Sequence, residues 1–157
     1  MTLYDNGFYK FEISKAFTKF NDIGELMLGN EYDQETAEEQ LMYQNIFPYL
    51  YIEGTQTVEK AYLCVEVDNP RIPNGNIKEM EITVLAYCHK GIMKYSKYGY
   101  AGTRADILAD MAFRAISTYA NNLGIKQIRL KRNKFAIPGD NFYGKELTLT
   151  CPEFARR

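Results

Sequence analysis

Residues 103–123 read TRADILADMAFRAISTYANNL, and this stretch decides the fold. Its apolar side chains recur at intervals of three and four residues, which places them on one face of an α-helix. Thr103 is suited to cap the first turn, and Gly124 is suited to end the helix in a left-handed conformation. The residues expected to be buried along this stripe are Met111, Ala115, Ile116 and Leu123. Those expected on the outer side are Arg104, Arg114 and Asn121.

Four segments around this helix alternate apolar and polar residues as strands do. Residues 61–67 and 78–89 flank a loop rich in Pro, Asn and Gly, so we expect them to form an antiparallel pair. Residues 125–132 and 146–151 are expected to form a second hairpin with a long tip, 133–145. A helix with one apolar stripe packs well on such a sheet.

The N-terminal part of the chain is expected to be mainly helical. A first helix is predicted over 8–20, a loop with an apolar plug over 21–33, and a short helix from a capping box at 36–39 to about residue 45. Residues 49–57 are a candidate extended segment. The predicted fold is therefore a single α+β domain over residues 1–157, with an antiparallel sheet of about four strands, the long helix on one face, and additional N-terminal helices.

Composition argues against several classes of function. No apolar run approaches the ~20 residues of a membrane span, and the first residues lack the pattern of a signal peptide. Cys64, Cys88 and Cys151 lie far apart in apolar runs, so we expect reduced core thiols. A single histidine and the absence of a CxxC pair leave too few ligands for structural zinc. Without a nucleotide-binding glycine motif or an acid–base constellation, we expect no metal, no cofactor and no enzymatic activity.

Charge and tyrosine content mark two candidate interaction segments. Residues 1–60 contain 11 acidic and 4 basic residues, whereas residues 61–157 contain 9 and 15. The glycine- and tyrosine-rich segment 90–102 is expected to be mobile in a free subunit and to become ordered against a partner. The second segment is the basic strand after the long helix. Because Tyr and Arg are enriched at interfaces, the residues expected at a subunit interface are Lys94, Tyr95, Lys97, Tyr98, Tyr100, Arg104, Arg129, Lys131 and Arg132.

Five short motifs carry a resemblance to a known family: 45–48 (NIFP), 62–67 (YLCVEV), 86–90 (AYCHK), 102–106 (GTRAD) and 141–144 (NFYG). With the order of helices and strands, they resemble the tail-terminator proteins of long-tailed phages, also called tail-completion or tail-to-head joining proteins. The resemblance implies a structural protein of the virion neck, made in the bacterial cytoplasm, that caps the tail tube as a hexameric ring. The implied partners are further copies of itself, the tail tube protein and the head-side connector. DNA would only pass through the ring lumen, and no membrane is involved.

Two alternative functions stay open on the sequence. Within the phage neck, a head-side adaptor or stopper protein fits the same element order. From a different class, a small nucleic-acid-binding module fits the cluster of Lys126, Arg129, Lys131, Arg132 and Lys134 together with nearby tyrosines. Basic side chains on an edge strand also have a structural use, because they prevent sheets from aggregating.

Overall fold

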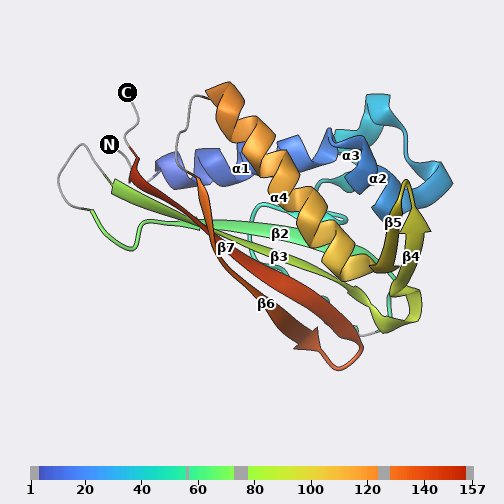
Figure 1. Cartoon of the computed structure of the whole chain (residues 1–157). Coiled ribbons are helices and arrows are strands. Elements are labelled where there is room, and N and C mark those ends of the chain that lie inside the picture. Colours follow the sequence, from blue (N-terminus) through green and yellow to red (C-terminus); the bar gives the residue numbers. More distant parts are fainter. Residues whose placement is uncertain (1–3, 56, 73–77, 124–127, 155–157) are drawn as a thin grey trace.

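A layer of helices covers one face of a twisted five-stranded sheet (Figure 1). The computed structural model describes residues 4–55, 57–72, 78–123 and 128–154. The helices are α1 (Tyr4–Thr18), α2 (Asn21–Leu28), α3 (Ala37–Leu41) and α4 (Arg104–Leu123). The strands are β1 (Ile46–Phe47), β2 (Ala61–Asp68), β3 (Lys78–His89), β4 (Lys94–Lys97), β5 (Tyr100–Thr103), β6 (Arg129–Gly139) and β7 (Phe142–Phe154). The large sheet has the order β1-β2-β3-β7-β6, and β4 and β5 form a separate hairpin.

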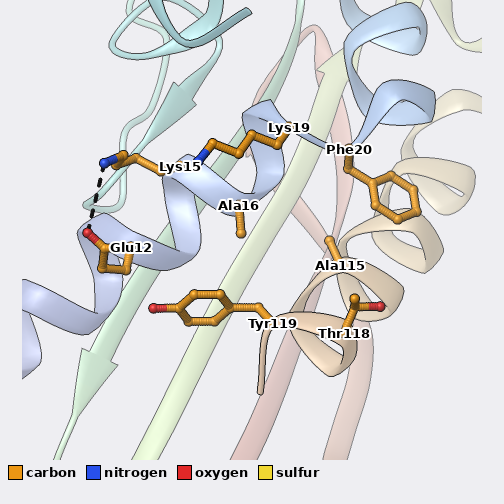
Figure 2. A pocket seen from close by; sticks show the side chains of 8 residues that line it. All are labelled: Glu12, Lys15, Ala16, Lys19, Phe20, Ala115, Thr118 and Tyr119. Atoms are coloured by element: carbon orange, nitrogen blue, oxygen red, sulfur yellow. Dashed lines mark ion pairs between the residues drawn. The ribbon is translucent and has the colours of Figure 1, made fainter. Parts of the chain in front are cut away.

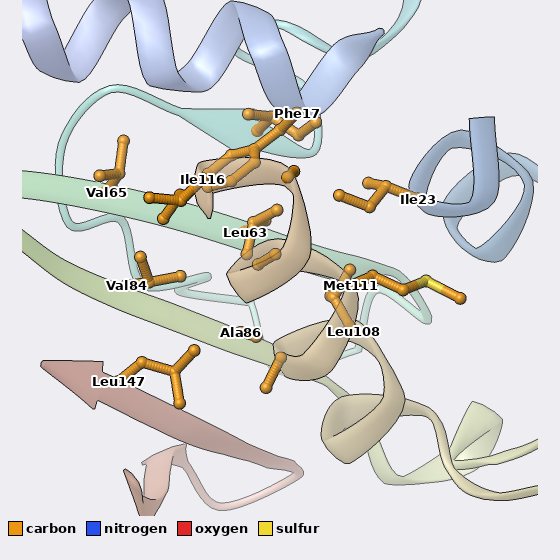
Figure 3. Close-up of a cluster of buried hydrophobic side chains, with 14 of the residues drawn as sticks. Phe17, Ile23, Leu63, Val65, Val84, Ala86, Leu108, Met111, Ile116 and Leu147 are labelled. Atoms are coloured by element: carbon orange, nitrogen blue, oxygen red, sulfur yellow. The ribbon is translucent and has the colours of Figure 1, made fainter. Parts of the chain in front are cut away.

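The long helix α4 lies across the sheet, as its sequence predicts (Figure 1). The Thr103 hydroxyl accepts a hydrogen bond from the Asp106 backbone N–H at 3.3 Å, which confirms the predicted cap. Figure 3 shows α4 side chains meeting those of α1 and of the strands in one core. Met111, Ala115 and Ile116 are buried, and Arg114 is exposed, as expected. The side chains of Leu123 and Asn121, and the predicted stop at Gly124, lie outside the described residues.

The strand pair β2–β3 also confirms its prediction, and β3 has the predicted bounds. Leu63 and Val84 belong to the helix-covered core, whereas Tyr62 and Tyr87 point to the opposite face. The three cysteines are buried, as expected. The expectation of about four antiparallel strands is wrong, because a fifth strand, β1, pairs in parallel with β2. Two residues are too few to show a periodic pattern, and β1 is positioned instead by Asn45, whose side-chain amide donates to the Ala61 carbonyl at 3.0 Å.

The second predicted hairpin is present, but the turn that joins its strands is much shorter than predicted. Strand β6 continues to Gly139, and β7 begins at Phe142, so only Asp140 and Asn141 form the turn. The segment predicted as a long tip therefore belongs to the sheet, where Phe135 pairs with Lys145. The predicted strand start at 125–127 lies in a part of the chain that the structure does not describe.

The N-terminal region contains one more helix than predicted. Helix α2 occupies the start of the predicted loop 21–33, and its Ile23 and Leu26 are buried in the core. Gly24 lies inside α2 and not in a loop, and a Cβ there would lie 2.1 Å from the ring of Tyr32, so a larger residue does not fit without movement. The predicted capping box is also wrong. The Thr36 side chain makes no capping bond, and α3 ends at Leu41.

The second face of the sheet is covered by extended chain rather than by helices. Phe47, Tyr62, Tyr87 and Phe142 form an aromatic core there with Cys64 and Leu85. Tyr51 packs on this core, and its ring stacks on that of Phe47 with centroids 4.1 Å apart. The residues after β1 thus cross the back of β2 and β3. They are not a strand, so the candidate extended segment 49–57 has no ladder of its own.

Gly144 of β7 is a position where only hydrogen fits. A Cβ there would lie 2.3 Å from the Ala86 carbonyl oxygen and 2.5 Å from Cβ of Tyr87, both fixed in β3. We predict that Gly144→Ala lowers the free energy of unfolding by about 1–3 kcal/mol, because main chain must move. Gly7→Ala in α1 is the matched control, since no atom lies within 4 Å of its Cβ. It should stabilise the protein by about 0.5–1 kcal/mol. Denaturant melts of both variants test this, and equal stabilities would contradict it.

Candidate functional site

The predicted interface residues fall into two groups, of which the first lies on the β4–β5 hairpin. The expectation that 90–102 is a mobile loop is wrong, because Lys97 pairs with Tyr100 across a two-residue turn. The turn residues Tyr98 and Gly99 have φ values of 54° and 83°. Positive φ at both positions is the geometry that tight antiparallel hairpins favour. The glycine therefore supports a folded hairpin.

Arg104 and Tyr95 hold this hairpin to the rest of the chain. The guanidinium of Arg104 lies over the Tyr95 ring, 4.7 Å from its centroid, and donates to the carbonyls of Ile92 and Leu26. Tyr95 is only 8% exposed. Both side chains therefore make contacts within the subunit, and their role at a subunit interface stays a prediction.

The outer part of the hairpin is tied to α2 and α4. Glu25 of α2 accepts a hydrogen bond from the Tyr98 hydroxyl and lies 3.2 Å from the Lys97 ammonium. These two donors hold the pKa of Glu25 below its usual value. Tyr100 lies 3.4 Å from a carboxylate oxygen of Asp110. Of the predicted hairpin residues, Lys94 and the ring of Tyr98 remain exposed.

The second group of predicted interface residues lies on the edge strand β6. Arg129, Lys131 and Arg132 are all exposed, and β6 forms the outer edge of the sheet with β7 as its one neighbour in the strand order. Phe135 and Ile137 of the same strand are 63% and 62% exposed. An edge strand with unpaired backbone and exposed apolar side chains is a template for pairing with another chain.

The two faces of β6 differ in character. Arg132 pairs in register with Thr148, on the face opposite to α4. Phe135 pairs with Lys145 and points to the helix-covered side, beyond the area that α4 covers. The strand therefore presents cations on one face and apolar side chains on the other.

Sequence reasoning missed a polar cluster on the back of the sheet, centred on Glu53. One carboxylate oxygen accepts hydrogen bonds from the hydroxyls of Tyr51 (3.0 Å) and Tyr62 (2.9 Å), and the other accepts from the backbone N–H of Thr55 (3.1 Å). The Glu53 N–H in turn donates to the Tyr87 hydroxyl at 3.2 Å. We call Tyr51, Glu53, Thr55, Tyr62 and Tyr87 the Glu53 clasp.

The clasp fixes a charge on a nearly buried group. Glu53 is 9% exposed, and the Thr55 N–H and the Tyr62 hydroxyl lower the pKa of its carboxyl to about 2. Hydrogen bonds to a carboxylate favour its ionised form. Burial, followed by the hydrogen bond to Glu53, raises the pKa of Tyr51, so this phenol stays neutral. The hydroxyls of Tyr51 and Tyr62 and the Thr55 N–H, which donate to this carboxylate, fasten the chain after β1 to the sheet.

The space between α1 and α4 has a volume of about 330 Å³ and is lined mainly by side chains of these two helices (Figure 2). Lys15 lies 4.0 Å from Glu12 there, and Tyr119 closes one side. Among the described residues, no group of three potential ligands could hold a metal ion. None of the described helices combines the length and the apolar character needed to cross a membrane. The expectation that the chain is not an enzyme stays a prediction.

Fold and surface together define an α+β protein with a layer of helices on one sheet and with charged and apolar side chains exposed on the edge strand β6. The family model of YomW, a phage-derived family, matches residues 21–151, which include every strand of the large sheet in whole or in part. The chain therefore belongs to the YomW family and is a phage-related protein. No curated protein matches it.

The clasp predicts a pH-dependent contribution to stability. Because folding lowers the pKa of Glu53 from 4.5 to about 2, its contribution is complete above about pH 4.5 and is lost as the pH falls towards 2. We predict that Glu53→Gln melts below the parent chain at neutral pH and that this difference shrinks between pH 4.5 and 2. Thermal melts followed by circular dichroism measure it. The exposed Glu38→Gln is the control, and a pH-independent difference for Glu53→Gln would contradict the assignment.

The packing of the hairpin predicts that Tyr95 and Tyr98 contribute differently to the stability of the protein. Tyr95→Ser should cost about 2–4 kcal/mol of stability, because it empties a buried site against Arg104. The exposed Tyr98→Ser should change stability by less than about 1 kcal/mol. The Tyr95 hydroxyl has no hydrogen-bond partner among the described residues, so Tyr95→Phe should keep full stability. Denaturant melts compare the three variants. Equal losses for Tyr95→Ser and Tyr98→Ser would show that the hairpin is not docked through Tyr95.

Proposed function

We propose that this phage-related protein is a structural tail-completion protein. In this role it forms a ring that caps the tail tube in the virion neck and joins it to the head-side connector. Membership of a phage-derived family supports the proposal, and so does the resemblance to tail terminators in the motifs described above. The ring is expected to be hexameric, with DNA passing through its lumen. The protein performs no catalysis in this role.

The exposed edge strand β6 is the observation that carries the proposal. Natural sheets protect their edges with short strands, charges or covering elements. Strand β6 is 11 residues long and carries charges, but it also exposes Leu130, Phe135 and Ile137. A free subunit with this edge would risk aggregation. We infer that the edge is covered in the working protein, as it would be in a ring.

The opposite edge of the sheet differs, which favours a head-to-tail ring over a symmetric dimer. Strand β1 has two residues, and exposed acidic residues lie just before it in the chain: Glu31, Asp33, Glu35, Glu38 and Glu39. The basic edge β6 and this acidic side are complementary. A contact between two different patches closes into a ring or continues as a filament, whereas a two-fold contact uses the same patch twice.

A nucleic-acid-binding module is the second candidate, favoured by the cations of β6. Arg129, Lys131 and Arg132 are exposed on one strand, and such a row suits a phosphate backbone. Against it, Lys134 lies 3.5 Å from Glu146, and apolar side chains share the strand. A head-side adaptor or stopper in the same neck would use the same surfaces. Binding to tail tubes distinguishes the two roles, because a tail terminator binds the tube and a head-side protein does not.

Charge reversal on β6 tests the proposed function. We predict that the parent chain forms a ring by native mass spectrometry, alone or on tail tubes, and that Arg129→Glu/Arg132→Glu weakens this association at least tenfold. Like charges facing the acidic side of the neighbour would be repelled. The control is Lys19→Glu, an exposed cation in the turn directly after α1. A chain that stays monomeric with tubes and binds DNA with a steep salt dependence would favour the nucleic-acid module.

A further inference from the structure

Residues 49–53 have an inverted pattern of burial. The carboxylate of Glu53 points inward, whereas Leu50 and Ile52 are 46% and 47% exposed. Tyr51 points inward as well and stacks on Phe47. A segment that faces only water would instead turn its apolar side chains inward. The inversion indicates a surface that another molecule covers.

The hydrogen bonds of the Glu53 clasp prevent residues 49–53 from turning their apolar side chains inward. Glu53 is bonded to the Tyr62 hydroxyl of β2, and the Tyr87 hydroxyl of β3 donates to the Tyr51 carbonyl at 2.6 Å. Turning Leu50 or Ile52 inward would break these bonds and leave buried hydroxyls without partners, which is costly. The apolar side chains are therefore held outward before any partner binds, and such preorganisation lowers the entropic cost of association.

Two tyrosines extend the apolar surface along the β1 edge. Tyr43 and Tyr49 are exposed, and both rings make edge contacts with Phe47 of β1. Tyr43 has a φ of 62°, a conformation that costs a non-glycine residue energy and that clusters at functional positions. We call Tyr43, Tyr49, Leu50 and Ile52 the β1-edge patch.

The other uncovered apolar surface lies at the same level on the far edge of the sheet. Phe135 pairs with Lys145, Lys145 with Ala86, Ala86 with Leu63, and Leu63 with Ile46 of β1. One row across the sheet thus begins at Phe135 and ends beside the β1-edge patch. The two surfaces lie on opposite edges, so one subunit cannot join them. They also lie on opposite faces, because Phe135 points to the helix-covered side and the patch lies on the back with Phe47. A second copy joins them when its β1 edge overlaps the β6 edge of the first.

We propose that the β1-edge patch of one subunit receives Phe135 and Ile137 of β6 from the next copy of this chain. The occupant is a second copy because the two surfaces match in level, in apolar character and in the charge of their flanks. Acidic residues precede the patch, and basic residues precede Phe135 on β6. The inference rests on the proposed function, because it names the lateral contact of the proposed ring.

Complementation between two variants tests the contact. Leu50→Glu/Ile52→Glu removes the patch and keeps β6, whereas Phe135→Glu/Ile137→Glu removes the β6 side chains and keeps the patch. Each variant alone should associate at least 100-fold more weakly than the parent chain. Mixed, they should form a 1:1 dimer with twice the 18.2 kDa mass of the chain and no ring, because one intact contact remains. Light scattering after size-exclusion chromatography measures the masses.

Control measurements distinguish a loss of folding from a loss of assembly. All four replaced side chains are exposed, so both variants should keep the circular dichroism spectrum of the parent chain. Phe11→Glu, on the outer side of α1, introduces a charge at an exposed aromatic outside both surfaces and should leave assembly unchanged. A patch variant that still forms rings, or a dimer of the patch variant alone through two β6 edges, would overturn the proposed contact.

The remaining outcomes separate this inference from the proposed function. If the parent chain caps tail tubes but the mixture gives no 1:1 dimer, the function stands and the contact is wrong. If the mixture dimerises but rings of the parent chain do not bind tail tubes, the contact stands and the tail-completion role is wrong. A parent chain that remains monomeric with and without tubes would overturn both.

Discussion

The packing of α4 on the sheet is the constraint on which the rest of the structure depends. Its apolar stripe buries Leu108, Met111 and Ile116 against β2, β3 and β7, while α1 and α2 close the core around it. Burial of this kind is the main favourable term in folding. With the helices on one face, the other face of the sheet must be covered by different means.

Extended chain covers that second face, and the way it is fastened creates a surface. The aromatic residues of the back core are shielded by the residues after β1, which have no ladder of their own. Hydrogen bonds of the Glu53 clasp hold them in place instead. Because the side chain of Glu53 points inward, its apolar neighbours Leu50 and Ile52 point outward and form an exposed apolar surface.

The β4–β5 hairpin shows that an amino-acid composition typical of interfaces also occurs in segments that pack within one subunit. Tyrosine, lysine and glycine in 90–102 are typical of contact loops, yet Tyr95, Arg104 and Lys97 find partners inside the subunit. Aromatic stacking and charge pairing serve intramolecular docking as well as association, so composition alone does not distinguish them. Strand β6 differs, because it lies at the edge of the sheet and its Arg129, Lys131 and Arg132 side chains are exposed.

The sequence by itself determined the elements whose signal is local. The 3.6-residue stripe of α4 and the two-residue alternation of β2 and β3 are properties of neighbouring residues, so their bounds were predicted within one residue. Tertiary structure alone decided β1, the clasp and the exposure of β6. Asn45 reaches Ala61, and Glu53 reaches Tyr87, 34 residues away, so no local pattern reports these bonds. The sequence of β6 alternates like that of a half-buried strand. Helix α4, however, packs mainly on β3 and β7. The exposure of Phe135 on β6 therefore follows from how the elements pack and not from the local pattern.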